Sequence, residues 1–271
     1  PPLDPLPSSL MTHVLLTNDD GISAPGLASL ERCARRLFDR VTVVAPDKNR
    51  SGVGQGLTLE DPLRCVPAGE DRYALSGTPT DCVIVAMNKM FRDQRPDFVL
   101  SGVNRGPNLG RDVFYSGTVA AAREGLFHQV PSVALSLAGD ARFPFEALEP
   151  AVERVLEVLV GREWGDGYLM NVNIPVPPAT PVGAGWSGVP GIKGMQVTSL
   201  GERFYNNELI VREDPRGGEY IWLGGAWPTL LDRPGTDCNA VREGYISLTP
   251  VGVELTERAA LDHWSDLEEG G

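Results

Sequence analysis

Basic residues are scarce in this chain of 271 residues. Lys and Arg total 24 against 36 Asp and Glu, which gives a formal net charge of −12. A surface that binds a nucleic-acid polymer needs basic patches, so this balance argues against such a partner. It does not exclude a small phosphorylated ligand, because a bound metal and a few local donors can reverse the field at one site.

Thiols and imidazoles are also few. The cysteines form no Cys-x-x-Cys pair, which argues against a zinc site of clustered thiolates and predicts reduced thiols in a cytoplasmic protein. Two of them fall on apolar helical patterns and are expected to be buried. The histidines lie outside the polar loops described below, so a serine–histidine or phosphohistidine mechanism is disfavoured. These residues are Cys33, Cys65, Cys82 and Cys238, with Cys33 and Cys82 on the helical patterns, and His13, His128 and His263.

Several signatures are missing as well. No apolar run reaches the length of a membrane span. There is no Gly-x-x-x-x-Gly-Lys-Ser/Thr run and no Gly-x-Ser-x-Gly elbow, which argues against a P-loop NTPase and an α/β-hydrolase. The glycines at 52, 54 and 56 lack dinucleotide-binding spacing and follow the second strand instead of the first. A nucleotide-cofactor oxidoreductase is therefore a weak alternative.

What is present is an alternation of strands and helices in the first half. It predicts an α/β fold with a Rossmann-like, doubly wound, mainly parallel sheet. The expected strands are 13–17, 41–45, 63–66, 73–75, 97–101 and 132–137, and the expected helices are 25–38, 78–91 and 117–128, with Thr80 as the N-cap of the second.

The domain organisation follows from a change of composition along the chain. Residues 1–12 are expected to be a disordered leader without a signal peptide, and residues 13–140 a Rossmann-like catalytic core. Residues 141–271 add a core helix at 145–160, a strand at 169–174 and a lobe rich in Pro, Gly and Trp. We expect this smaller lobe to form extended hairpins for oligomerisation, with a weak helical pattern near 254–264.

The most informative stretch is residues 13–20, where an apolar strand runs into Asp19 and Asp20. Two adjacent carboxylates repel each other and are costly to bury, and a divalent cation removes that penalty. The carboxyl end of a strand is also where open α/β sheets bind ligands. A solvated Asp-Asp-Gly turn is the structural alternative.

Two further loops leave core strands on the same side of the predicted sheet and carry Asn49, Ser51 and Asn104. Together with the aspartates they offer carboxylate, hydroxyl and amide oxygens. This set suits a hard cation, Mg²⁺, Mn²⁺ or Ca²⁺, better than zinc.

A fourth segment, residues 115–120, leads into a helix and contains Ser116, Gly117 and Thr118. Free N–H groups and the helix dipole favour an anion there. The alternative is that the two hydroxyl side chains only cap the helix. A cation and an anion cradle at one edge together indicate a phosphate monoester bridged to a metal.

With these motifs the sequence resembles the SurE family, the stationary-phase survival proteins. The resemblance covers roughly residues 13–255 and lies in the segments 15–27, 44–52, 77–83, 101–110 and 115–125, with 235–237 and 243–250 further on. Lys48 departs from the family, which commonly has Arg there.

The resemblance implies a metal-dependent 5′/3′-nucleotidase that hydrolyses nucleoside monophosphates to nucleoside and phosphate, some members also trimming short polyphosphate. It implies one Mg²⁺ or Mn²⁺ held by Asp19, Asp20, Ser51 and Asn104, and a homodimer or homotetramer.

Our hypothesis for catalysis assigns Asp19, Asp20 and Asn104 to the reaction. Asn18, Asn49 and residues 116–118 would hold phosphate oxygens. The nucleophile is either a metal-activated water or a carboxylate, with Asp19 the better candidate of the pair. The main rival is a non-catalytic regulatory protein that binds metal or nucleotide without releasing phosphate.

Overall fold

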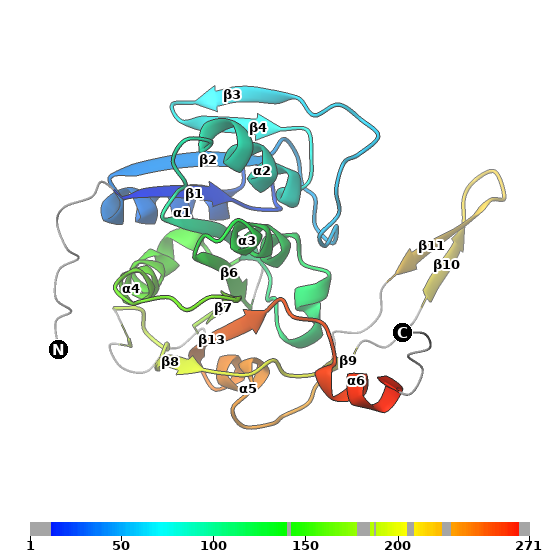
Figure 1. Cartoon of the computed structure of the whole chain (residues 1–271). Helices are drawn as coiled ribbons and strands as arrows, with labels where there is room; N and C mark the ends of the chain where they lie inside the picture. Colours follow the sequence, from blue (N-terminus) through cyan, green and yellow to red (C-terminus); the bar gives the residue numbers. More distant parts are fainter. Residues whose placement is uncertain are drawn as a thin grey trace.

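The computed structural model of this chain describes residues 12–139, 142–177, 185–186, 188–204, 209–223 and 229–265. All but the last residue of the predicted leader lie outside these ranges. The architecture is a nine-stranded sheet in the order β3-β4-β2-β1-β5-β6-β7-β13-β8, with helices on both faces (Figure 1).

Six neighbouring strands form the parallel part of this sheet, from β4 through β2, β1, β5 and β6 to β7. β3 pairs antiparallel with β4, β13 pairs antiparallel with β7, and β8 lies at the other edge, parallel to β13. The predicted α/β, mainly parallel fold is confirmed. The strands of the sheet are β1 (His13–Thr17), β2 (Arg40–Pro46), β3 (Cys65–Gly69), β4 (Arg72–Leu75), β5 (Phe98–Arg105), β6 (Ser132–Ala138), β7 (Tyr168–Pro175), β8 (Gly194–Val197) and β13 (Tyr245–Gly252).

The helices form two layers. α1 and α4 pack on one face of the sheet in one apolar cluster, and α2 and α3 pack on the other. Three of the helical segments are short. η1 is a π-helix, and η2 and η3 are 3₁₀-helices. The helical bounds are α1 (Pro25–Leu37), α2 (Pro79–Val85), η1 (Ala86–Met90), η2 (Gly110–Phe114), α3 (Gly117–Phe127), η3 (Phe145–Leu148), α4 (Glu149–Val160), α5 (Asp237–Arg242) and α6 (Arg258–Trp264).

The burial of strand β1 on both faces explains why the sequence before the aspartates is apolar. Val14 and Leu16 are fully buried in the cluster with α1 and α4, whereas Leu15 is fully buried in the cluster with α2. Successive side chains of a strand point to opposite faces, so a strand covered on both faces needs an unbroken apolar run. This burial fixes where the strand ends and where Asp19 and Asp20 emerge.

The second predicted helix differs in its start. Its N-cap is Thr78 and the expectation of Thr80 is wrong, because Pro79 occupies the first helical position, where it lacks an N–H to satisfy. Thr78 Oγ1 accepts a 3.1 Å hydrogen bond from Asp81 N–H, and Asp81 Oδ2 accepts one of 2.9 Å from Thr78 N–H. This reciprocal capping box closes the first turn.

Strand β5 is longer than predicted. The expected strand ended at residue 101, but pairing with β6 continues to Arg105, with a register shift between Ser101 and Asn104. Asn104 therefore lies within a sheet strand and does not lie in a free loop. Its backbone is held by β6, which fixes the side chain more firmly than a loop would.

The second half of the chain contributes an arm. β10 (Leu209–Glu213) and β11 (Glu219–Leu223) form an antiparallel hairpin that stands away from the body in Figure 1. β9 (Arg203–Phe204) precedes this hairpin in the chain and β12 (Thr229–Leu230) follows it, and the two strands pair antiparallel with each other. The predicted extended hairpin is confirmed. No helix within the described residues is long and apolar enough to span a membrane.

Candidate metal and phosphate site

Main-chain contacts bring the predicted site residues together at the carboxyl ends of β1 and β5. Arg50 N–H donates a 2.7 Å hydrogen bond to the carbonyl of Asp19, which places the loop of Ser51 beside the aspartates. Arg105 N–H approaches Asp20 Oδ2 at 3.4 Å, which places Asn104, the preceding residue, at the same edge. The four predicted metal ligands thus come from three segments, and the segments of Ser51 and Asn104 each contact the segment of the aspartates.

The fourth segment contacts Asp19 directly. Thr118 Oγ1 donates a 2.6 Å hydrogen bond to Asp19 Oδ1, and both residues are buried. Gly117 must be glycine for this approach, because a Cβ there would lie 2.8 Å from Asp19 Cβ and 3.1 Å from Asp19 Oδ2. The first turn of α3 is therefore packed against the carboxylate that the sequence places at the centre of the site.

The electrostatics of the aspartate pair favour a cation. Burial raises the pKa of both carboxyl groups, and the neighbouring charge of Asp20 raises the pKa of Asp19 further. The hydrogen bond from Thr118 opposes the rise for Asp19, and the N–H of Arg105 opposes it for Asp20. A divalent cation would stabilise both charged forms at once. The oxygen-only donor set fits Mg²⁺, Mn²⁺ or Ca²⁺.

The other two predicted ligands occupy different surroundings. Ser51 is exposed, and its N–H donates a 2.8 Å hydrogen bond to Asn49 Oδ1, so Asn49 shapes the loop that presents the hydroxyl. Asn104 is half-buried and uses its amide nitrogen to donate 2.9 Å to the carbonyl of Gly106. Its amide oxygen is the atom that would coordinate a hard cation.

Asn18 supports the turn of the aspartates. It is fully buried, its Nδ2 donates 3.0 Å to the carbonyl of Gly21, and its Oδ1 accepts 3.1 Å from Gly21 N–H. These bonds use one N–H of the amide, and the second N–H is the group that a phosphate contact would take. Asn18 thus holds the conformation that presents Asp19 and Asp20.

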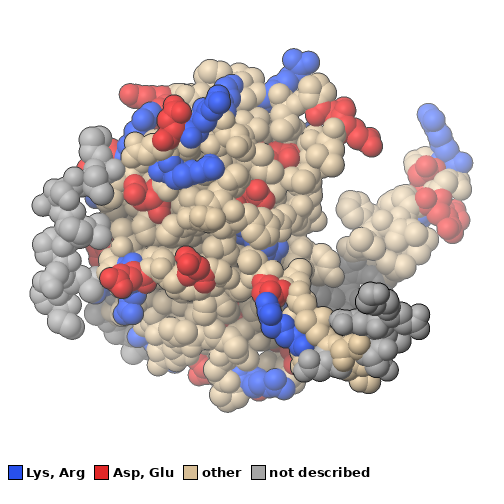
Figure 2. Space-filling model, viewed as in Figure 1, with Lys and Arg blue, Asp and Glu red and all other residues tan. Residues whose placement is uncertain are grey.

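Ser116 is the N-cap of α3. Its Oγ accepts a 3.1 Å hydrogen bond from Val119 N–H. The N–H of Thr118 bonds the Asp19 carboxylate and lowers its pKa, which leaves the N–H of Gly117 at the helix start. Both the capping role and the anion-binding role of this turn are therefore compatible. On the face seen in Figure 2, basic and acidic side chains are interspersed and do not gather into a broad basic field.

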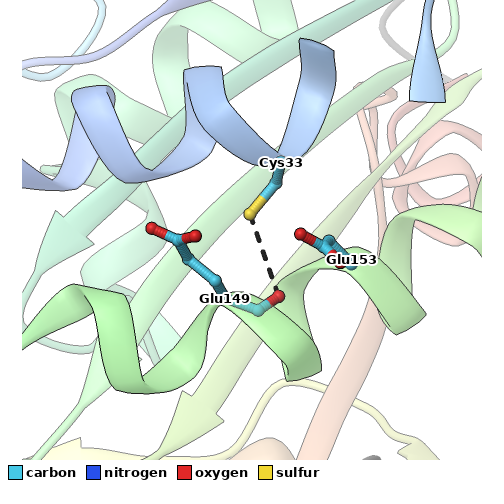
Figure 3. A group of neighbouring side chains, drawn as sticks. All are labelled: Cys33, Glu149 and Glu153. Atoms are coloured by element: carbon cyan, nitrogen blue, oxygen red, sulfur yellow. Dashed lines mark hydrogen bonds between the residues drawn. The ribbon is translucent and has the colours of Figure 1, made fainter. Parts of the chain in front are cut away.

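A second acidic group lies elsewhere, between α1 and α4, where Cys33, Glu149 and Glu153 approach one another (Figure 3). The carboxylates of this group already accept hydrogen bonds. Arg32 donates one of 2.8 Å to Glu149, and Arg36 donates hydrogen bonds to both Glu149 and Glu153. Burial, with the charges of the two glutamates, raises the pKa of Cys33 to about 12, so the thiol stays protonated. This cluster joins two helices and does not resemble a metal site.

Sequence reasoning missed residues that connect the loops. Asp81 accepts a 3.2 Å hydrogen bond from Thr58 N–H as well as capping α2, so it ties the chain after Ser51 to that helix. Asn108 is buried and donates 2.7 Å to Ser136 Oγ. The Thr-Pro-x-Asp spacing at 78–81 is a local capping signal that identifies Asp81, whereas Asn108 lies outside the strands and its partner Ser136 lies on β6, 28 positions away.

Fold and site together define a doubly wound α/β protein in which a pair of adjacent aspartates meets a helix N-terminus at the carboxyl edge of the sheet. The sequence model of the family described as "Survival protein SurE" matches residues 14–207. The chain belongs to the SurE family.

Individual relatives agree over nearly the whole chain. A protein of Vibrio cholerae described as "5′-nucleotidase SurE" is 44% identical over 254 residues, covering 93% of this chain and 96% of its own. A protein of the same description from Paramagnetospirillum magneticum is 42% identical over 254 residues, covering 93% of each chain. The crystal structure of the SurE protein from Aquifex aeolicus superposes with a TM-score of 0.79 at 35% identity, covering 95% of this chain and 100% of its own.

Proposed function

We propose that this chain is a 5′/3′-nucleotidase, a phosphoric monoester hydrolase that converts nucleoside monophosphates to nucleoside and phosphate. The observation that supports the proposal is the contact of Asp19 with the first turn of α3, which would join the proposed cation site to the proposed anion site. The relatives described as 5′-nucleotidases, at 42–44% identity over nearly the full chain, support the same reaction.

The cation of this proposal is one Mg²⁺ or Mn²⁺, with Ca²⁺ as a further candidate, held by Asp19, Asp20, Ser51 and Asn104. When bound, it would supply a Lewis acid that polarises a phosphoryl oxygen and neutralises charge that develops in the transition state. The raised pKa values of the aspartates indicate that their charged forms need such a counter-charge.

The remaining residues would bind and orient the phosphate. The N–H of Gly117 begins α3, where the positive end of the helix dipole would face an anion. Ser116 fixes this helix start, and Asn49 and Asn18 shape the turns that present Ser51 and the aspartates. These groups stabilise the transition state because they are held in place before the substrate arrives.

The proposal extends to assembly and location. Exposed apolar side chains line the hairpin arm, among them Ile210, Ile221 and Trp222, and such an area is typical of a protein interface. We infer a homodimer or homotetramer built through these arms. Four free cysteines support a reducing, cytoplasmic location.

The deciding experiment measures inorganic phosphate released from 5′- and 3′-nucleoside monophosphates and from short polyphosphate. It is run in EDTA and then with Mg²⁺, Mn²⁺ or Ca²⁺ restored, for the wild type and Asp19→Asn. We expect metal-dependent release from the nucleotides that the substitution abolishes. Saturable nucleotide binding without phosphate release under every metal would instead support a regulatory binding protein.

A further inference from the structure

A buried carboxylate in the second half of the chain bonds to the segment that leads into α3. Asp237 is fully buried at the start of α5. Its Oδ2 accepts a 2.8 Å hydrogen bond from Gly110 N–H, and its Oδ1 accepts 2.7 Å bonds from the N–H groups of Gly201 and Cys238. One side chain thus fixes η2, the chain after β8 and the first turn of α5 to one another.

The approach of these segments is close enough to require glycine. Gly110 has a φ of +54°, and a Cβ at this position would lie 2.5 Å from the carbonyl oxygen of Gly201. η2 therefore begins in direct backbone contact with the second half of the chain. A larger residue would push the two segments apart and stretch the bonds to Asp237.

A second contact holds the middle of η2. Arg203 forms an ion pair with Asp112, and the two side chains are only 8% and 13% exposed. The main-chain carbonyl of Asp112 accepts hydrogen bonds from Tyr115 N–H at 3.0 Å and Ser116 N–H at 3.1 Å. Asp112 thus connects Arg203 to the residue that caps α3.

We propose that Asp237 and Arg203 are positioning residues for the phosphate-side turn at residues 115–118, an inference that rests on the proposed function. They hold η2 at Gly110 and Asp112, and η2 holds the turn through the carbonyl of Asp112. The turn at residues 115–118 places Thr118 against Asp19. Both side chains are buried outside the proposed site, so they act on catalysis by fixing where the N-terminus of α3 lies.

The test is Asp237→Asn. The amide keeps the size of the carboxylate, but its NH₂ group must face either Gly110 N–H or the N–H groups of Gly201 and Cys238. At least one buried donor is then left unpaired, and η2 shifts. A displacement of about 1 Å at a reacting group can cost about 10²-fold in rate. We expect kcat to fall and KM for the nucleotide to rise, with up to about 10²-fold lost in kcat/KM.

Two readouts separate positioning from a general loss of stability. Affinity for Mn²⁺ should fall in the folded protein, because a shifted turn weakens the hydrogen bond from Thr118 to the proposed ligand Asp19. Hydrogen exchange should accelerate in peptides covering residues 110–119 and stay unchanged in residues 149–160. The matched control is Asp232→Asn, whose half-exposed carboxylate pairs with Arg242 beside the same helix. It should match the wild type in every readout.

A folded Asp237→Asn protein with wild-type kinetics and wild-type exchange at 110–119 overturns the proposal, and so does faster exchange spread evenly over the whole chain. If Asp237→Asn does not fold, Asp112→Asn replaces it, since it removes the ion pair to Arg203 and keeps the carbonyl of residue 112. If the wild type releases no phosphate, the proposed function fails, and exchange at 110–119 still decides whether these residues position the turn.

Discussion

Thr118 and Asp19 lie 99 positions apart in the sequence, and the hydroxyl of one donates a 2.6 Å hydrogen bond to the carboxylate of the other. This bond joins the start of α3 to the end of β1. It couples the orientation of a proposed metal ligand to the proposed phosphate-binding turn. Ligand orientation by such a neighbour is as much a part of a metal site as the ligand itself.

Thr118→Val removes this hydroxyl at nearly constant volume. The pKa of Asp19 should rise further, because the hydrogen bond that lowers it is gone. We expect metal affinity or kcat to fall by about 10–100-fold. Titration with Mn²⁺ and steady-state kinetics measure both, and Thr118→Ser, which keeps the hydroxyl, should retain most of the affinity. Equal affinities for Thr118→Val and wild type would contradict this role.

Asp19→Asn should abolish metal binding and reduce turnover to background while the fold persists. The amide keeps the shape of the side chain but removes the charge that a hard cation needs. Isothermal titration with Mn²⁺, phosphate release and circular dichroism report the three properties. Asp93→Asn, at an exposed carboxylate outside the site, is the control. Wild-type rates with the same metal dependence would show that the site is elsewhere.

His13 and His128 should contribute a loss of stability as the pH falls below 6.5. Burial lowers the pKa of His13 and of His128 below the ordinary 6.5, and the charges of Arg40 and Arg95 lower them further. The unfolded chain then binds protons that the folded chain does not, so stability is lost as the pH falls from 6.5 through the folded pKa values. Thermal unfolding from pH 7.5 to 5.5 measures this slope.

The control for this pH effect is the doubly substituted chain His13→Gln, His128→Gln. Both replacements are uncharged throughout the pH range, so the loss of melting temperature between pH 6.5 and 5.5 should be smaller than in the wild type. An unchanged slope would assign the pH dependence to other groups.

One cysteine should react quickly with a thiol reagent in the native protein. Burial raises the pKa of Cys33 and Cys238 to about 12 and that of Cys82 well above its usual value, so these three stay protonated. Cys65 is half-buried at the edge strand β3. A colorimetric titration should count one fast thiol per native chain and four in denaturant. Several fast native thiols would show that the helices open.

Trp222→Glu should shift the chain towards monomer. Trp222 is 62% exposed and lies opposite Ile210 in the hairpin arm, so a charge there would be buried unpaired in an interface between arms. Size-exclusion chromatography with light scattering measures the mass, and Glu213→Gln on the same arm is the control. An unchanged oligomer would place the interface outside the arm.

The parts of the fold that follow from local pattern were predictable. The apolar run before Asp19 marks β1 because each of its side chains faces a covered side of the sheet, and Pro25 marks the start of α1. Thr78 and Thr80 show the limit of such signals. Either hydroxyl could cap a helix in sequence terms, and only the placement of Pro79 inside the first turn separates them.

The site was predictable in its residue types and only partly in its connections. Strand ends on one edge of a parallel sheet meet, so the proximity of residues 19, 51 and 104 followed from the predicted topology. The bond of Asp237 to Gly110 did not, because these two residues become neighbours only in the folded chain. No spacing in the chain encodes that Asp237 reaches a residue 127 positions away.

The position of β13 has a consequence for the order in which the chain becomes structured during synthesis. β13 lies between β7 and β8, and in the described sheet β8 pairs only with β13. Residues 194–197 are therefore synthesised before their pairing partner. They can join the sheet only after residues 245–252 have left the ribosome. Until then β7 is an open edge that can accept a foreign strand. The last strand to be made closes this edge, and a chain terminated before it would be exposed to aggregation.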